Sequence, residues 1–149
     1  MKILVDADAL PGIARDILLR AVQRVQIKAI FIANKVLTLP DSDFVGFELA
    51  DAGPDEADDR IVELAEMGDL VVTADIPLAA RVVARGAVAI DPRGSFFDEN
   101  NVRERLFVRD FMADLRSSGA ITGGPSAYGK KESRRFAALL DQWLAKAAR

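Results

Sequence analysis

The chain has 149 residues, half of them hydrophobic, and a formal net charge of −3. This length and composition predict a single domain, residues 1–149, with its own hydrophobic core. There is no cysteine and no histidine, so disulfides, thiolate zinc sites, cysteine nucleophiles and histidine bases are all excluded. Any metal must therefore bind through oxygen ligands, which suit Mg²⁺ and Mn²⁺.

Charge is unevenly distributed along the chain. Residues 1–75 hold 7 Lys/Arg against 15 Asp/Glu, which gives −8, whereas residues 76–149 hold 13 against 8, which gives +5. Two explanations fit this uneven charge equally well. One is ordinary surface charge, and the other is an acidic metal site beside a basic surface that holds substrate. The sequence starts without a charged leader and has no stretch long enough to cross a bilayer, so we expect a soluble cytoplasmic protein without a membrane partner.

Strands and helices alternate through the first part of the chain. A short apolar run over residues 3–5 ends at Asp6, and residues 13–25 carry a helical stripe with Pro11 in the first turn of that helix. Residues 27–33 are almost continuously apolar, which predicts a central parallel strand. A weaker third strand is expected over residues 44–49.

The alternation continues to residue 90. Residues 53–68 predict a helix that Gly68 ends, and residues 69–73 a strand that leads to Asp75. A helix over residues 76–85 and a final strand over residues 87–90 follow.

This order predicts a three-layer α/β fold with a mostly parallel central sheet and helices on both faces. The carboxyl ends of its strands share one edge, where open α/β sheets bind ligands, and this edge should collect Asp6, Asn34, Asp75 and Asp91.

The last third of the chain is predicted to be a C-terminal helical extension. Two apolar stripes, over residues 102–115 and 136–144, indicate helices that we expect to pack on the sheet. A Gly-rich segment over residues 117–125 separates them and leads to Tyr128 and the basic residues of 130–135. Such a run is more often a solvated helix start than a nucleic-acid contact, and one aromatic residue is weak evidence for base stacking.

Each aspartate has an ordinary structural explanation. Asp8 and Asp75 precede helices, where aspartate is a favoured cap. Asp58 and Asp59 lie in the first turns of their helix, where the helix dipole favours negative charge. Taken one at a time, these explanations are the stronger ones.

Together, however, carboxylates that meet at one sheet edge repel each other by roughly 1 kcal/mol per close pair even in water, and a bound cation relieves this cost. The set suits metal-assisted phosphoryl chemistry. We predict that Asp6, Asp8, Asp59 and Asp75 bind Mg²⁺ or Mn²⁺, and that these four and Asp58 form the catalytic group.

Substrate contacts are predicted beside the acidic group. Asn34 and Thr73 are positioned at strand ends to orient a ligand or water, although satisfying the backbone there is their more common role. Arg93 and Arg103 are candidates for phosphate, since guanidinium groups match phosphate oxygens in pairs. Arg105 and Arg109 share a helical face with a similar potential. Ion pairing with acidic neighbours is the slightly stronger expectation for all of these arginines except Arg93.

Six segments together resemble the YaiI/YqxD family of uncharacterised bacterial proteins, over essentially the whole chain. Leu10 is a departure, at a position where many relatives are expected to have cysteine. The segments are Val5-Asp-Ala-Asp-Ala-Leu-Pro11, Asp55-Glu-Ala-Asp-Asp-Arg-Ile-Val62, Gly68-Asp-Leu-Val-Val-Thr-Ala-Asp-Ile-Pro-Leu-Ala79, Asp91-Pro-Arg-Gly94, Arg109-Asp-Phe-Met112 and Thr122-Gly-Gly-Pro125.

The resemblance implies a PIN-like domain. Metal-dependent ribonucleases of that group carry an aspartate after the first strand, acids on a middle helix and a Thr/Ser-x-Asp element after a later strand. Asp6, then Asp58 or Asp59, and then Thr73-Ala74-Asp75 match these positions. The family has no settled function, so the resemblance implies the fold more firmly than the activity.

Three functions remain open on the sequence. The first is a Mg²⁺- or Mn²⁺-dependent nuclease that hydrolyses phosphodiester bonds in RNA or another nucleic acid. The second is a haloacid-dehalogenase-like phosphatase in which Asp6 is the nucleophile, Asp8 the acid/base and Lys35 the phosphate neutraliser. The third is a non-catalytic PIN-like module that binds RNA or a protein partner.

Overall fold

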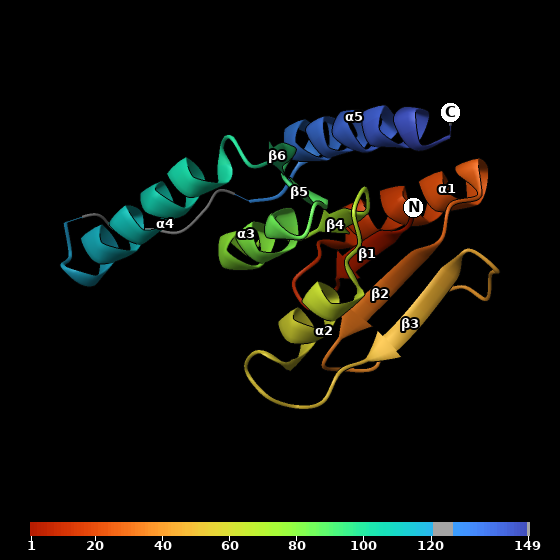
Figure 1. Ribbon diagram of the computed structural model, residues 1–149, viewed down its shortest axis with the longest axis horizontal. Coiled ribbons are helices and arrows are strands. Elements are labelled where there is room, and N and C mark those ends of the chain that lie inside the picture. The colour runs from red at the N-terminus through yellow and green to blue at the C-terminus, as the bar shows by residue number, and fades with distance from the viewer. Residues whose placement is uncertain (121–126, 149) are drawn as a thin grey trace.

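One six-stranded sheet with helices on both faces organises the molecule (Figure 1). The computed structural model describes residues 1–120 and 127–148. The strands in these ranges are β1 (Ile3–Asp6), β2 (Ala29–Ala33), β3 (Val45–Leu49), β4 (Leu70–Val72), β5 (Val88–Asp91) and β6 (Ser95–Phe97). The helices are α1 (Gly12–Val25), α2 (Glu56–Leu64), α3 (Ile76–Ala84), α4 (Val102–Ser117) and α5 (Lys130–Ala147). None of these helices combines the length and apolar character that crossing a bilayer requires.

Strand order places a crevice beside Asp6. The order across the sheet is β3-β2-β1-β4-β5-β6, in which the first five strands are parallel and β6 is antiparallel to β5. From β1 the chain builds outward through β2 and β3, and later returns to the other side of β1 with β4. Open α/β sheets bind ligands at such a change of direction, beyond the carboxyl ends of the strands.

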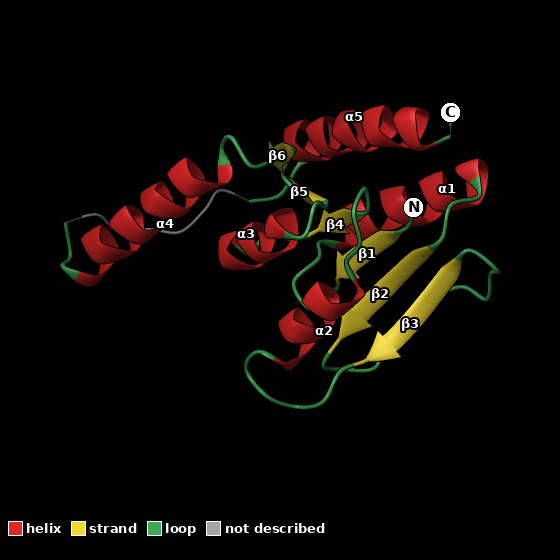
Figure 2. Cartoon of the chain, viewed as in Figure 1, coloured by secondary structure: helices red, strands yellow, loops and turns green. Residues whose placement is uncertain are grey.

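The sheet separates two hydrophobic cores, because successive strand residues point to opposite faces. Ile3 and Val5 of β1 pack with α1 and α5, whereas Leu4 packs with α2 and α3 (Figure 2). The buried strands are therefore apolar at nearly every position, as expected for a parallel sheet that is covered on both sides. The predicted three-layer α/β fold with a mostly parallel sheet is confirmed.

The C-terminal helix α5 completes one of these layers. Its Phe136, Leu140 and Leu144 are fully or almost fully buried against the core that α1 shares. This part of the predicted helical extension packs on the sheet as expected.

The expectation that the preceding helix also packs on the sheet is wrong. Only Val102 is buried among the residues of α4, which contacts α3 and extends outward from the body of the molecule (Figures 1 and 2). Both faces of the sheet are already covered by the other four helices, so the apolar stripe of α4 has no place there.

Two element boundaries also differ from the prediction. The strand predicted to be the last is followed by β6, whose three residues are too few to show a periodicity. Helix α2 ends at Leu64, and Gly68, with φ +87°, instead forms the turn that leads into β4. The predicted Gly-rich loop lies partly at residues 121–126, outside the described residues.

Candidate functional site

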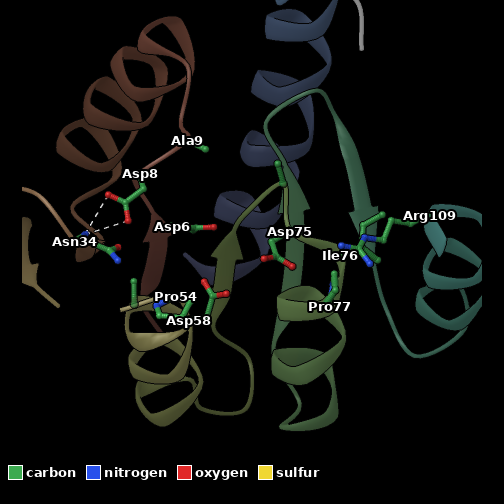
Figure 3. Close-up of a pocket in the computed structure, with 12 residues that line it drawn as sticks. Asp6, Asp8, Ala9, Asn34, Pro54, Asp58, Asp75, Ile76, Pro77 and Arg109 are labelled. Carbon is green, nitrogen blue, oxygen red and sulfur yellow. Dashed lines mark hydrogen bonds between the residues drawn. The ribbon is translucent and has the colours of Figure 1, made fainter. Parts of the chain in front are cut away.

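An open pocket of about 540 Å³ lies beyond the carboxyl ends of β1 and β4 (Figure 3). It unites four of the five aspartates that the sequence predicts to be catalytic with one predicted substrate-binding residue and one arginine. These residues are Asp6, Asp8, Asp58, Asp75, Asn34 and Arg109. The small side chains of Ala9, Ala57 and Ala74 also line the pocket and leave it open between the acids.

Thr73 joins the ends of the two central strands. The register pairs Val5 with Val72, so Asp6 and Thr73 are the next positions and face the α2/α3 side together. The Thr73 hydroxyl donates to Oδ2 of Asp6 at 2.8 Å and accepts from the backbone N–H of Asp75 at 3.0 Å. Thr73 is only 1% exposed and does not line the pocket itself, so the structure places it behind the acids, where its hydroxyl joins Asp6 to Asp75.

Asp75 caps helix α3, as its position before Pro77 predicts. Its Oδ1 accepts from the backbone N–H of Leu78 at 3.1 Å. Asp6 and Asp75 each use one carboxylate oxygen in these hydrogen bonds. The second oxygens, Oδ1 of Asp6 and Oδ2 of Asp75, make no hydrogen bond within residues 1–120 and 127–148.

Asp8 does not cap helix α1 as the sequence predicts, but binds the backbone at the end of β2. Helix α1 begins after Pro11, without a side-chain cap. Both oxygens of Asp8 accept instead from the backbone N–H of Asn34, at 3.1 and 3.0 Å, while the Asn34 side-chain amide donates to the Gly53 carbonyl. The pair therefore ties the end of β1 to the end of β2, and both side chains line the pocket, as Figure 3 shows.

Of the two adjacent acids on α2, only Asp58 lines the pocket. Asp59 points away from the pocket and forms an ion pair with Arg81 at 2.9 Å. The structure therefore places Asp59 outside the pocket that the other three aspartates predicted to bind metal share. Consecutive residues on a helix point about 100° apart, so only one of the two can face the sheet edge.

Mutual repulsion is evident in the carboxyl groups of the pocket. Burial, together with the charges of Asp75 and Asp8, raises the pKa of Asp6, although the Thr73 hydrogen bond opposes this. Burial and then the charges of Asp75, Asp6 and Asp55 raise the pKa of Asp58 to about 6. Neighbouring carboxylates thus make both Asp6 and Asp58 harder to ionise.

The donor set of this pocket fits Mg²⁺ or Mn²⁺ in its chemistry, since it offers carboxylate and amide oxygens only. The carboxylates, however, lie farther apart than the ligands of a bound metal ion do. In the described part of the chain, no three carboxylates are close enough together to hold a metal ion as they stand. The aspartates share a pocket, and binding a cation requires their side chains to turn inward.

We expect Asp58→Asn to stabilise the metal-free protein above pH 6. The pKa of Asp58 is raised from 3.8 to about 6 in the folded state, so the folded state binds this proton more tightly than the unfolded chain. Stability from this group is therefore present at low pH and lost as the pH rises from about 4 to 6. Allowing for solvent exposure, the variant should gain roughly 1 kcal/mol or less at pH 8.

The measurement is urea unfolding in a chelator at pH 4 and pH 8. Asp59→Asn is the matched control, because it removes a carboxylate that has an Arg81 partner and should not stabilise the protein. Equal stabilities of wild type and Asp58→Asn at pH 8 would contradict the assigned repulsion.

Arg109 is the arginine that lines the acidic pocket, and it was only a secondary candidate on the sequence. Its Nη1 also lies 2.9 Å from Oδ1 of the exposed Asp110. The two arginines predicted for phosphate binding lie elsewhere: Arg103 lines a different pocket with Glu99, and Arg93 lies 3.9 Å from Glu132. The position of α4 brings Arg109 to the acidic pocket, and this position cannot be predicted from the sequence.

Other predicted contacts are also absent from the pocket. The Tyr128 hydroxyl donates to the Pro92 carbonyl at 2.9 Å, and its ring packs against the core, so it is not a free stacking surface. Asp91, at the end of β5, accepts from the backbone N–H of Arg93 and does not line the pocket. Lys35, which the phosphatase hypothesis needs beside the phosphate, does not line it either.

Comparison with known proteins gives one consistent result. The chain is 51% identical over 146 residues to a UPF0178 protein of Cupriavidus pinatubonensis, which covers 98% of this chain and 97% of the relative. It is 53% identical over 144 residues to a UPF0178 protein of Myxococcus xanthus, with 97% and 94% covered. A relative from Cronobacter sakazakii is 51% identical over 144 residues, with 97% and 95% covered.

No solved structure gives a significant match. The family described as "Uncharacterized BCR, YaiI/YqxD family" matches residues 4–146, which is nearly the whole chain. The resemblance noted in the sequence is thereby confirmed, and the chain belongs to the YaiI/YqxD family of bacterial proteins.

Proposed function

We propose that the protein is a metal-dependent nuclease that hydrolyses phosphodiester bonds in RNA. The observation that carries this proposal is that Asp6 and Asp75 line the same pocket, together with Arg109. Each aspartate has one carboxylate oxygen in a hydrogen bond, while its other oxygen has none in the described structure. The PIN-like resemblance of the same positions supports it.

Mg²⁺ or Mn²⁺ would be held by Asp6 and Asp75, with Asp58 from α2 and Asp8 from the end of β1 available as further ligands. A divalent cation here would activate water and offset the charge that develops on the phosphate. The residues of the chain prepare for this: Thr73 fixes the Asp6 carboxylate, and Asp8 holds the loop after β2 against the pocket.

Arg109 supplies the positive charge that four carboxylates lack for a polyanionic substrate. A guanidinium group binds two phosphate oxygens at once, and Arg109 lies in the pocket beside Ile76 (Figure 3). In our proposal it grips a phosphate of the RNA strand while the aspartates hold the metal.

The direct test is incubation of the purified protein with labelled single-stranded RNA in Mg²⁺, in Mn²⁺ and in a chelator. Cleavage that requires the metal supports the proposal. RNA binding that survives chelation without any cleavage would instead identify the non-catalytic module. Release of phosphate from a monoester, with an aspartyl-phosphate trapped on Asp6, would identify the phosphatase.

We expect Arg109→Ala to lower kcat/KM for RNA cleavage by about 10- to 100-fold, since charged hydrogen bonds contribute about 1.5–3 kcal/mol. Steady-state kinetics at several salt concentrations measure this effect. Arg103→Ala is the matched control: it removes an arginine of the same helix from a different pocket, and its activity should remain near that of the wild type. Equal losses in both variants would show a general charge effect and remove Arg109 from the site.

A further inference from the structure

Four exposed cations gather on the first turns of helix α5. They lie on the side of the helix opposite the buried Phe136 and Leu140. None of their side chains makes an ion pair or a hydrogen bond with residues 1–120 or 127–148. We call these residues the α5 basic patch: Lys130, Lys131, Arg134 and Arg135.

The placement of these charges is unfavourable for the helix itself. The amino end of a helix dipole is positive and repels cations. The patch also forms two pairs of residues four positions apart, where like charges repel each other. Glu132, the acid in this stretch, is 17% exposed, accepts from the backbone N–H of Gly129 at 3.0 Å and lies 3.9 Å from Arg93. Folding therefore does not explain the patch, whereas a bound polyanion would offset both kinds of repulsion.

The α5 basic patch lies at the same edge of the sheet as the acidic pocket. The strands β4 and β5 are parallel neighbours, and the backbone N–H of Thr73 donates to the Ile90 carbonyl at 3.0 Å. The end of β5 therefore lies beside the segment that leads from β4 to Asp75. Helix α5 begins beside β6, the strand that follows β5 (Figure 1).

The turn after β5 holds the amino end of α5 in place. The Tyr128 hydroxyl donates to the Pro92 carbonyl at 2.9 Å. Gly94 has a φ of +94° and lies directly against Cβ of Arg135, where a larger residue would not fit. These contacts fix the position of the patch relative to the end of the sheet.

Positive charge also lies between the pocket and the patch. Arg105 is one helical turn before Arg109, and its guanidinium group lies over the ring of Phe97 in β6, 4.8 Å from the centroid. Burial raises the pKa of Asp91, and a hydrogen bond from the Arg93 backbone N–H and the charges of Arg105 and Arg93 oppose this rise. A chain of phosphates that leaves the pocket on this side therefore meets arginines first and then the patch.

We propose that the α5 basic patch binds the phosphate backbone of the RNA strand that enters the acidic pocket. This inference rests on the proposed nuclease function and narrows its substrate class. The substrate is a strand of several nucleotides, long enough to reach from the acids to α5, and a dinucleotide cannot use the patch. Because phosphates carry no base identity, the patch adds affinity without sequence preference.

RNA binding in a chelator tests the patch in the absence of cleavage. The probe is a labelled single-stranded RNA of about 12 nucleotides, within the range of site sizes of single-strand-binding domains. Lys131→Gln combined with Arg134→Gln should weaken binding by about tenfold. It should also lower the slope of log K against log salt by about 1.4, since each phosphate contact on a single strand contributes about 0.7. Without RNA, the Tm of this variant should equal or exceed that of the wild type, because charge repulsion in the helix is reduced.

The matched control is Arg20→Gln combined with Lys146→Gln. It removes the same two charges from exposed positions on α1 and on the last turn of α5, and neither side chain has an ion-pair partner in the part of the chain that the structure describes. This control should bind RNA like the wild type. Equal losses in both variants would show an effect of net charge alone and overturn the inference.

Cleavage kinetics in Mn²⁺ separate the patch from the proposed function. On the longer RNA the patch variant should show a KM about tenfold higher and an unchanged kcat, whereas both enzymes should cleave a dinucleotide alike. If the patch variant bound and cleaved the longer RNA like the wild type, the inference would be wrong and the nuclease proposal would stand. Patch-dependent RNA binding without cleavage by the wild type would support the patch and refute the nuclease. Binding of anionic lipid vesicles but not of RNA would overturn the inference.

Discussion

If the protein is the proposed nuclease, replacing Asp6 by asparagine should lower kcat/KM for metal-dependent RNA cleavage by about a thousandfold, within the range that loss of a charged catalytic group produces. Asn keeps the size of the side chain and one oxygen for the Thr73 hydroxyl, but it loses the negative charge that attracts the cation. Because burial and neighbouring carboxylates raise the pKa of Asp6, removing its charge should not destabilise the fold.

The control for this experiment is Asp59→Asn, which removes the same charge from a carboxylate outside the pocket. It should cleave RNA at nearly the wild-type rate. Metal titration monitored by thermal unfolding gives a second readout: Mn²⁺ should raise the Tm of the wild type and of Asp59→Asn, and much less that of Asp6→Asn. If Asp6→Asn kept the metal-dependent cleavage of the wild type, the proposed site would be wrong.

Replacing Thr73 by valine should both destabilise the protein and impair the site. Valine has nearly the same shape, but it leaves the partly buried Asp75 backbone N–H without its partner, which costs about 1 kcal/mol. Asp6 also loses the hydroxyl that holds its Oδ2, so its carboxylate is free to turn. We expect cleavage to fall by about 10- to 100-fold, as for other losses of a ligand's supporting hydrogen bond.

Thr73→Ser separates these two contributions from simple loss of packing. Serine removes one methyl group and retains the hydroxyl, so its cleavage rate should remain close to that of the wild type even where its Tm falls. Urea unfolding and steady-state kinetics measured on both variants make the comparison. A valine variant as active as the serine variant would show that the hydroxyl does not position the acids.

Much of the fold follows from the sequence, since strands buried on both faces are apolar throughout. Residues 27–33 and 69–73 were recognised as strands in this way, and the parallel alternation then placed Asp6 and Asp75 at one edge. The prediction failed where this signal is absent. β6 has three residues, and α4 has an apolar stripe that resembles a core stripe but faces outward.

The candidate site was predictable only to the level of elements. Asp58 and Asp59 are adjacent, so choosing between them requires the rotation of α2, which depends on how Ala57 and Ile61 pack. Arg103 and Arg109 are six residues apart and point to different sides of α4, so the direction and rotation of that helix decide which of them reaches the acids. Both choices depend on tertiary packing, which one sequence does not display.

Because the sheet has a separate hydrophobic core on each face, insertions and deletions are tolerated only at certain places in the chain. Deleting or adding one residue within β1 would exchange the faces of all residues that follow it in the strand. Asp6 would then point toward α1 and α5, away from Thr73 and Asp58, and apolar side chains would change cores with it. Engineered insertions should therefore be tolerated in surface connections such as residues 35–44, and a single extra residue in a central strand should not be.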